Sequence, residues 1–171
     1  DNITNYDVIL DKVMAEFMKG KSRGPETSNF EHLYNYNMTI GFHRLAINGL
    51  DNISNQPIKR NGYILICNGE IYNYHLLEKQ YGFKYQTHSD CESIICLFEH
   101  FTNNNTDNII ETVLNNLDGV FSFILLESFS IKSFIFSKLI LFNLTISSKL
   151  LNINFSSLFL NFTLISIIDY Y

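Results

Sequence analysis

The sequence contains no tryptophan, only two prolines and three cysteines among its 171 residues. The cysteines, Cys67, Cys91 and Cys96, are odd in number and form no Cys-x-x-Cys pair. This pattern argues against a disulfide framework and against a zinc site. We therefore expect reduced thiols and a cytosolic protein.

Basic residues are also scarce, with 12 Lys and Arg against 17 Asp and Glu and a net charge of −5. No basic run accompanies this charge, which excludes a general polyanion-binding protein, and we expect no nucleic-acid partner. The chain lacks a basic start followed by an apolar segment, so we expect no signal peptide. Apolar residues make up 46% of the chain, enough for one domain with a packed core.

Glycine, proline and cysteine do not occur after Gly119. From Ser128 to Tyr171 the chain uses only nine residue types and lacks the usual turn and capping residues. All nine types can be written with A/T-rich codons. We therefore divide the chain into a domain, residues 1–127, and a compositionally biased tail, residues 128–171. Our interpretation of the tail is translated intron or frameshifted sequence, not native domain sequence.

Two other interpretations of the tail stay open. Leu150 to Ile168 carries no charge and has the length of a membrane span, about 20 residues. Polar residues that are costly in lipid interrupt it, so we do not expect a membrane partner. The remaining interpretation is a genuine strand-rich end of the domain. The interrupting residues are Asn152, Asn154, Ser156, Ser157, Asn161, Thr163 and Ser166.

Residues 1–127 combine helical and strand periodicity, which is typical of an α+β fold. Asn61-Gly62 predicts a hairpin turn, and Ser22 to Ser28 and Asn48 to Pro57 predict loops. We expect Asp90 to cap the helix that follows it, with Glu92 in the first turn. The predicted helices cover 8–18, 74–81 and 90–101, and the predicted strands cover 38–45, 63–67 and 120–126.

The most informative segment is Asn68-Gly69-Glu70, where we expect the apolar strand 63–67 to end abruptly. Glycine lets the backbone turn with its N–H exposed, and Asn68 offers a side-chain amide donor beside it. Two donors aimed at one point form an oxyanion hole for acyl transfer. An ordinary Asn-Gly turn after a strand is the simpler interpretation of these residues taken alone.

Three charged residues indicate a small-ligand site near this segment. Arg44, at the end of a predicted strand, is suited to clamp a carboxylate in bidentate fashion, although a surface ion pair is the ordinary role. Glu70 and Asp90 are suited to hold an ammonium group between them, although most acidic residues are simply solvated.

None of the three cysteines is a well-supported candidate for a catalytic nucleophile. His88 lies three residues before Cys91, but proximity in sequence does not place a base on a thiol. Cys67 in an apolar strand and Cys96 on an apolar helix face are typical inert core thiols.

Five segments, in order, resemble the glutaminase domain of glutamine-hydrolysing asparagine synthetases, which are class II glutamine amidotransferases. The resemblance covers about residues 1–127. Its most specific part is Asn68-Gly69-Glu70-Ile71-Tyr72-Asn73, because other class II amidotransferases carry different residues after the Asn-Gly pair. The segments are 23–26 (RGPE), 43–47 (HRLAI), 68–74 (NGEIYNY), 89–92 (SDCE) and 117–123 (LDGVFSF).

The resemblance implies an N-terminal-nucleophile hydrolase fold with four αββα layers, incomplete in this chain. It implies that Arg44 binds the α-carboxylate of glutamine and that Glu70 and Asp90 hold the α-amino group. Asn68, through its side chain, and Gly69, through its backbone N–H, would form the oxyanion hole. The segment Leu45, Ala46, Ile47 and Asn48 would line the pocket.

In the resembled family, glutamine is hydrolysed and the ammonia reacts with β-aspartyl-AMP in a synthetase domain that binds ATP and Mg. We expect neither that domain nor any cofactor in this chain, and the full-length protein is a possible homodimer. The family nucleophile is an N-terminal Cys whose own α-amine acts as base. This chain begins at Asp1 and its cysteines are internal, so we expect an inactive fragment.

Three alternatives to this interpretation stay open. The first is a non-catalytic glutamine-binding or regulatory paralogue, and the second is another class II amidotransferase such as an aminosugar synthase. The third is a membrane-anchored form that uses the tail.

Overall fold

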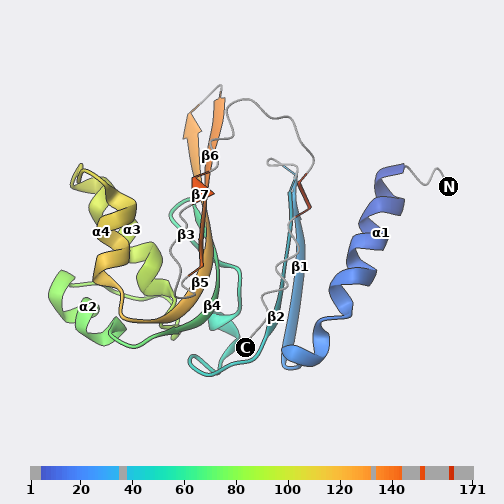
Figure 1. Cartoon of the computed structure of the whole chain (residues 1–171), viewed down its shortest axis with the longest axis horizontal. Helices are drawn as coiled ribbons and strands as arrows, with labels where there is room; N and C mark the ends of the chain where they lie inside the picture. The colour runs from blue at the N-terminus through green and yellow to red at the C-terminus, as the bar shows by residue number, and fades with distance from the viewer. Residues whose placement is uncertain (1–4, 35–37, 132–133, 144–150, 153–161, 164–171) are drawn as a thin grey trace. The chain divides into compact units, whose positions relative to one another are not determined.

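A computed structural model describes residues 5–34, 38–131, 134–143, 151–152 and 162–163, with side chains described within 8–34 and 38–127. The chain divides into two compact units. The first comprises Asp1–Ala46 and Ser157–Tyr171, and the second comprises Ile47–Ser156. Each unit contains both helix and strand, so the fold class is α+β, as predicted (Figure 1).

The first unit places one long helix beside a small sheet. It contains α1 (Asn5–Met18), the 3-10 turn η1 (Lys21–Arg23) and the strands β1 (Thr27–Leu33), β2 (Met38–Arg44) and β8 (Phe162–Thr163). β2 pairs with β1 antiparallel and with β8 parallel. Phe17 of α1 is buried, and its ring stacks on the ring of His43 at 3.9 Å. Helix α1 ends shortly before Gly20, and β2 ends one residue earlier than predicted.

The second unit is built on a five-stranded antiparallel sheet. Its order is β3 (Ile58–Arg60), β4 (Tyr63–Ile71), β5 (Gly119–Ile131), β6 (Phe134–Asn143) and β7 (Leu151–Asn152). The hairpin between β3 and β4 turns at Asn61 and Gly62, both with positive φ, as the Asn-Gly signal predicts. The predicted strand 120–126 lies inside β5, which extends beyond it at both ends.

Three helices cover one face of this sheet: α2 (Tyr74–Tyr81), α3 (Glu92–Asn103) and α4 (Ile109–Asn116) (Figure 1). The core forms where Leu65 and Phe123 of the sheet meet Ile94 and Phe98 of α3 and Val113 of α4. Each such side chain contributes about 1.5–3 kcal/mol when fully buried. Helix α2 has the predicted bounds, whereas β1 and α4 were not predicted.

The described part of the tail consists of strands. β5 continues past residue 127 to Ile131 and pairs with β6, and β7 and β8 follow. Only β7 and β8 are described within the candidate membrane segment 150–168, and the rest of that segment lies outside the described residues. In the described ranges, no helix is long and apolar enough to cross a membrane. The boundary between residues 127 and 128 stays a prediction.

Candidate functional site

The predicted site residues are shared between the two units, and we describe each group within its own unit. The first unit holds Arg44, Leu45 and Ala46, and the second holds Ile47, Asn48, Asn68, Gly69, Glu70 and Asp90.

The Asn68-Gly69-Glu70 segment lies within β4 and not after it, which corrects two predictions. The strand does not end at residue 67, and no Asn-Gly turn forms there, because β4 continues to Ile71. Asn68 pairs with Ser122 and Glu70 with Val120 of β5 in the antiparallel ladder.

Gly69 is required by this close pairing. Its φ is +132°, a conformation that L side chains rarely adopt. A Cβ atom at this position would lie 2.1 Å from the carbonyl oxygen of Val120. Glycine therefore allows β4 and β5 to approach each other beside Asn68 and Glu70, both of which are half-buried.

Asn48, Glu70 and Asp90 come together although they are far apart in sequence. Asn48 donates a hydrogen bond from Nδ2 to Oε1 of Glu70 at 3.3 Å. The Asn48 side chain also hydrogen-bonds the Asp90 carboxylate. Two carboxylates that share an amide partner are suited to bind an ammonium group.

The Asp90 carboxylate is held by the backbone of β4. It accepts a hydrogen bond from the N–H of Ile71, with 2.6 Å between N and Oδ2. Burial raises the pKa of Asp90, and the charge of Glu70 acts in the same direction, while the hydrogen bonds from Ile71 and Asn48 oppose them. The prediction that Asp90 caps the following helix with its side chain is therefore wrong: Asp90 contributes only its backbone carbonyl, to Ser93.

Arg44 is the last residue of β2 and is buried, with 8% of its surface exposed. Its carbonyl accepts a hydrogen bond from the N–H of Glu26, and the Glu26 carboxylate accepts one from the N–H of Ala46. Residues 23–26 and 43–46, from two segments of the resemblance, thus lie side by side in the first unit. Leu45 is exposed, as is Ile47 at the start of the second unit.

All three thiols are buried, with at most 3% of each cysteine exposed. A hydrogen bond to Cys91, together with burial, raises the pKa of Cys67 well above its ordinary value. Burial raises the pKa of Cys96 to about 12. His88 pairs with Asp51. The prediction that Cys67 and Cys96 are core thiols is confirmed, and none of the three resembles an activated nucleophile.

Some supporting residues were missed by the sequence reasoning. Gln56 pairs through its side-chain amide with both backbone groups of Cys67, donating to the carbonyl at 2.8 Å and accepting from the N–H at 2.6 Å. Glu92, expected only to favour a helix dipole, is fully buried and pairs with Arg60 at 2.7 Å. Local patterns do not reveal such partners, because they lie on separate elements.

The described ranges contain no group of three or more His, Cys, Asp or Glu side chains placed to hold a metal ion.

Comparison with known proteins agrees with the resemblance. A family model described as a glutamine amidotransferase domain matches residues 4–136. The glutamine-hydrolyzing asparagine synthetase of Gallus gallus is 42% identical over 123 residues, which covers 69% of this chain and 20% of that protein. The corresponding proteins of Bos taurus and Homo sapiens are 41% and 37% identical, with the same coverage. The chain spans about a fifth of the length of these curated relatives.

Proposed function

Since the chain belongs to the family of glutamine amidotransferase domains, we propose that it carries the glutamine-binding part of a glutaminase domain of the asparagine-synthetase type. The whole protein then hydrolyses glutamine and uses the ammonia in ATP-dependent conversion of aspartate to asparagine. The observation that supports this proposal most directly is the cluster of Asn48, Glu70 and Asp90. For the complete domain we propose the αββα N-terminal-nucleophile hydrolase fold.

In this proposal the charged residues recognise the amino-acid end of glutamine. Glu70 and Asp90 hold the α-ammonium group, and the Arg44 guanidinium binds the α-carboxylate. Leu45, Ala46, Ile47 and Asn48 line the pocket.

Asn68 and Gly69 act at the other end of glutamine, where its side-chain amide reacts. The side-chain amide of Asn68 and the backbone N–H of Gly69 stabilise the oxyanion that forms when the glutamine side-chain amide is attacked. The attacking group in the family is an N-terminal Cys thiol. Because Cys67, Cys91 and Cys96 are internal and buried, we propose that none of them serves, and that a polypeptide of residues 1–171 binds glutamine without hydrolysing it.

The remaining assignments follow from the same proposal. The domain covers residues 1–127 and works with a synthetase domain, which binds ATP and Mg. Dimerisation of the full-length protein and a cytosolic location also stay predictions.

Glutamine binding to the full chain, measured by isothermal titration calorimetry, tests the proposal. Glu70→Gln removes a charge-assisted contact worth about 1.5–3 kcal/mol, so affinity should fall roughly tenfold or more. Arg44→Ala should weaken binding similarly. Glu78→Gln is the matched control, because Glu78 is a partly exposed carboxylate of α2. Absence of saturable binding, or equal affinity in Glu70→Gln and Glu78→Gln, would contradict the proposal.

A further inference from the structure

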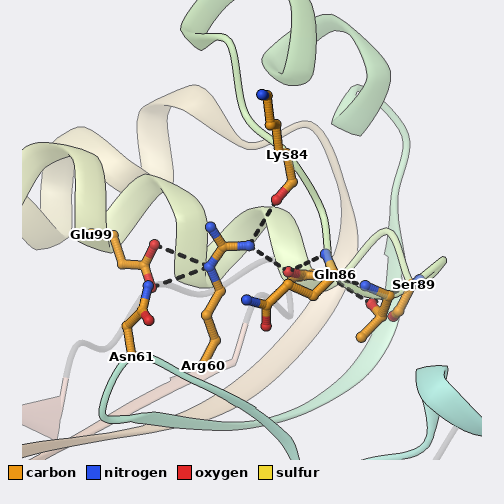
Figure 2. Close-up of polar contacts among 8 residues, drawn as sticks. Arg60, Asn61, Lys84, Gln86, Ser89 and Glu99 are labelled. Carbon is orange, nitrogen blue, oxygen red and sulfur yellow. Dashed lines mark hydrogen bonds and ion pairs between the residues drawn. The ribbon is translucent and has the colours of Figure 1, made fainter.

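A buried ion pair lies beside the loop that leads to Asp90. The Glu92 carboxylate is fully buried at the start of α3 and pairs with Nη1 of Arg60 on β3 at 2.7 Å. Figure 2 shows the same guanidinium between the Glu99 carboxylate and the carbonyl oxygen of Lys84, which it contacts at 2.9 Å. A buried carboxylate is costly unless it is paired and hydrogen-bonded, and Glu92 is both.

The remaining bonds of Glu92 go to the loop before Asp90. Its carboxylate accepts hydrogen bonds from the N–H of Gln86 at 2.9 Å, and from the N–H and the hydroxyl of Thr87, both at 2.7 Å. The Thr87 hydroxyl in turn accepts a hydrogen bond from the N–H of Ser89 at 3.2 Å. A continuous series of bonds thus runs from Arg60 to the residue that directly precedes Asp90.

Asp90 is also fixed from its other side. Its carbonyl accepts hydrogen bonds from the N–H of Ser93 at 3.1 Å and the Ser93 hydroxyl at 2.7 Å. The backbone on both sides of Asp90 is therefore held by hydrogen bonds, and its carboxylate accepts the N–H of Ile71. Buried ion pairs are often replaceable by apolar residues without loss of stability, so the pair of Arg60 and Glu92 is compatible with a positioning role.

We infer that Arg60, Glu92 and Thr87 are positioning residues that set the direction of the Asp90 carboxylate and, through it, selectivity for a ligand with an α-amino group. This inference rests on the proposed role of Asp90 in glutamine binding. None of the three contacts the ligand. They act by restricting the loop 86–89.

The test compares two ligands of the full chain, glutamine and 4-carbamoylbutanoate, which lacks only the α-amino group. Thr87→Val removes the bridging hydroxyl and keeps the side-chain shape, whereas Thr87→Ser keeps the hydroxyl. Loss of the bridge should lower the preference for glutamine about fivefold, as expected for one hydrogen bond. Thr87→Ser should keep the wild-type preference. Thr112→Val is the matched control, because it removes a hydroxyl of α4 that contacts the carbonyl of Asp107 and lies outside the bonds of Arg60, Glu92 and Thr87.

A second readout does not depend on any ligand. Hydrogen exchange and the ¹H shift of the Ile71 amide report directly on its bond to Asp90. Thr87→Val should accelerate exchange at Ile71, and Thr87→Ser should not. If the wild-type chain binds neither ligand, the proposed function fails. The positioning role is then tested by hydrogen exchange at the Ile71 amide alone.

Unchanged Ile71 exchange in Thr87→Val overturns the positioning role, and unchanged ligand preference overturns its part in selectivity. Should Thr87→Val fail to fold, Arg60→Lys replaces it, because lysine retains the charge that Glu92 needs but not the forked geometry. Arg60→Lys should show the same lower preference for glutamine and the same faster exchange at Ile71. If it shows neither change, the inference is overturned.

Discussion

The backbone N–H of Ile71 donates a hydrogen bond to the carboxylate of Asp90, with 2.6 Å between nitrogen and Oδ2. This bond connects β4 to the loop before α3. Asp90 is buried, with 3% of its surface exposed. Burial raises the pKa of that carboxyl group. Ionisation of Asp90 is therefore less favourable in the folded protein than in the unfolded chain, as is common where a charge serves binding.

Asp90→Asn should weaken glutamine binding while leaving the protein equally or more stable at pH 7. Since the folded pKa lies above the unfolded one, the carboxyl group lowers the free energy of unfolding as pH rises from the unfolded pKa through the folded pKa. The amide keeps an acceptor for Ile71 and has no charge. Thermal unfolding between pH 3 and 7 should show an advantage of the variant at pH 7 that shrinks toward pH 3. A lower Tm at pH 7 would contradict this prediction.

Gly69→Ala should destabilise the protein far more than Gly82→Ala. Both glycines have positive φ, but a Cβ at Gly69 would collide with the Val120 carbonyl, whereas a Cβ at Gly82 meets nothing within 4 Å. We expect a loss of about 1–2 kcal/mol at Gly82 and at least about 3 kcal/mol at Gly69, where backbone collision is added to strain. Urea unfolding measures both, and similar losses would contradict the close approach of β4 and β5.

Gln56→Leu should cost about 2–4 kcal/mol, because it leaves the buried N–H and carbonyl of Cys67 without their partner. Gln86→Leu is the matched control, since that side chain is exposed and should change stability by less than about 0.5 kcal/mol. Urea unfolding measures the free energy of unfolding of the two variants. Equal losses in both would mean that the hydrogen bonds of Gln56 do not contribute to stability.

The three thiols should react slowly with iodoacetamide at pH 8 in the folded chain. Cys67 and Cys96 have raised pKa values, and all three cysteines are buried, so little thiolate is present or accessible. Mass spectrometry should find all three alkylated only after denaturation. Rapid labelling of any one of them would contradict their assignment as core thiols, and glutamine turnover lost in Cys91→Ala would make Cys91 a nucleophile.

Local signals predicted the elements that are formed by local interactions. The Asn61-Gly62 turn and helix α2 follow directly from turn chemistry and periodicity. β1 escaped prediction because six of its seven residues are only half-buried and show no clear alternation. α4 escaped because it begins after Asn108 in the left-handed conformation, with no side-chain cap.

Tertiary contacts explain the errors within the site. Asn68-Gly69 resembles a turn, but pairing with β5 keeps both residues within β4. Asp90 resembles a helix cap, but the Ile71 amide takes its carboxylate. The grouping of Asn48 and Glu70 with Asp90 depends on pairing between distant segments, which a local pattern does not contain.

The pairing of β4 with β5 also governs the order of events as the protein is made. Tyr63 hydrogen-bonds Glu127, 64 positions away along the chain, and the segment between them carries α2, α3 and α4. Such long-range contacts form slowly, since the loop must close before they contribute. Until β5 leaves the ribosome, β4 has one edge exposed and only the short β3 as partner. A nascent chain that stops before Gly119 therefore contains every residue proposed to contact glutamine, without the strand that holds Asn68 and Glu70 in register.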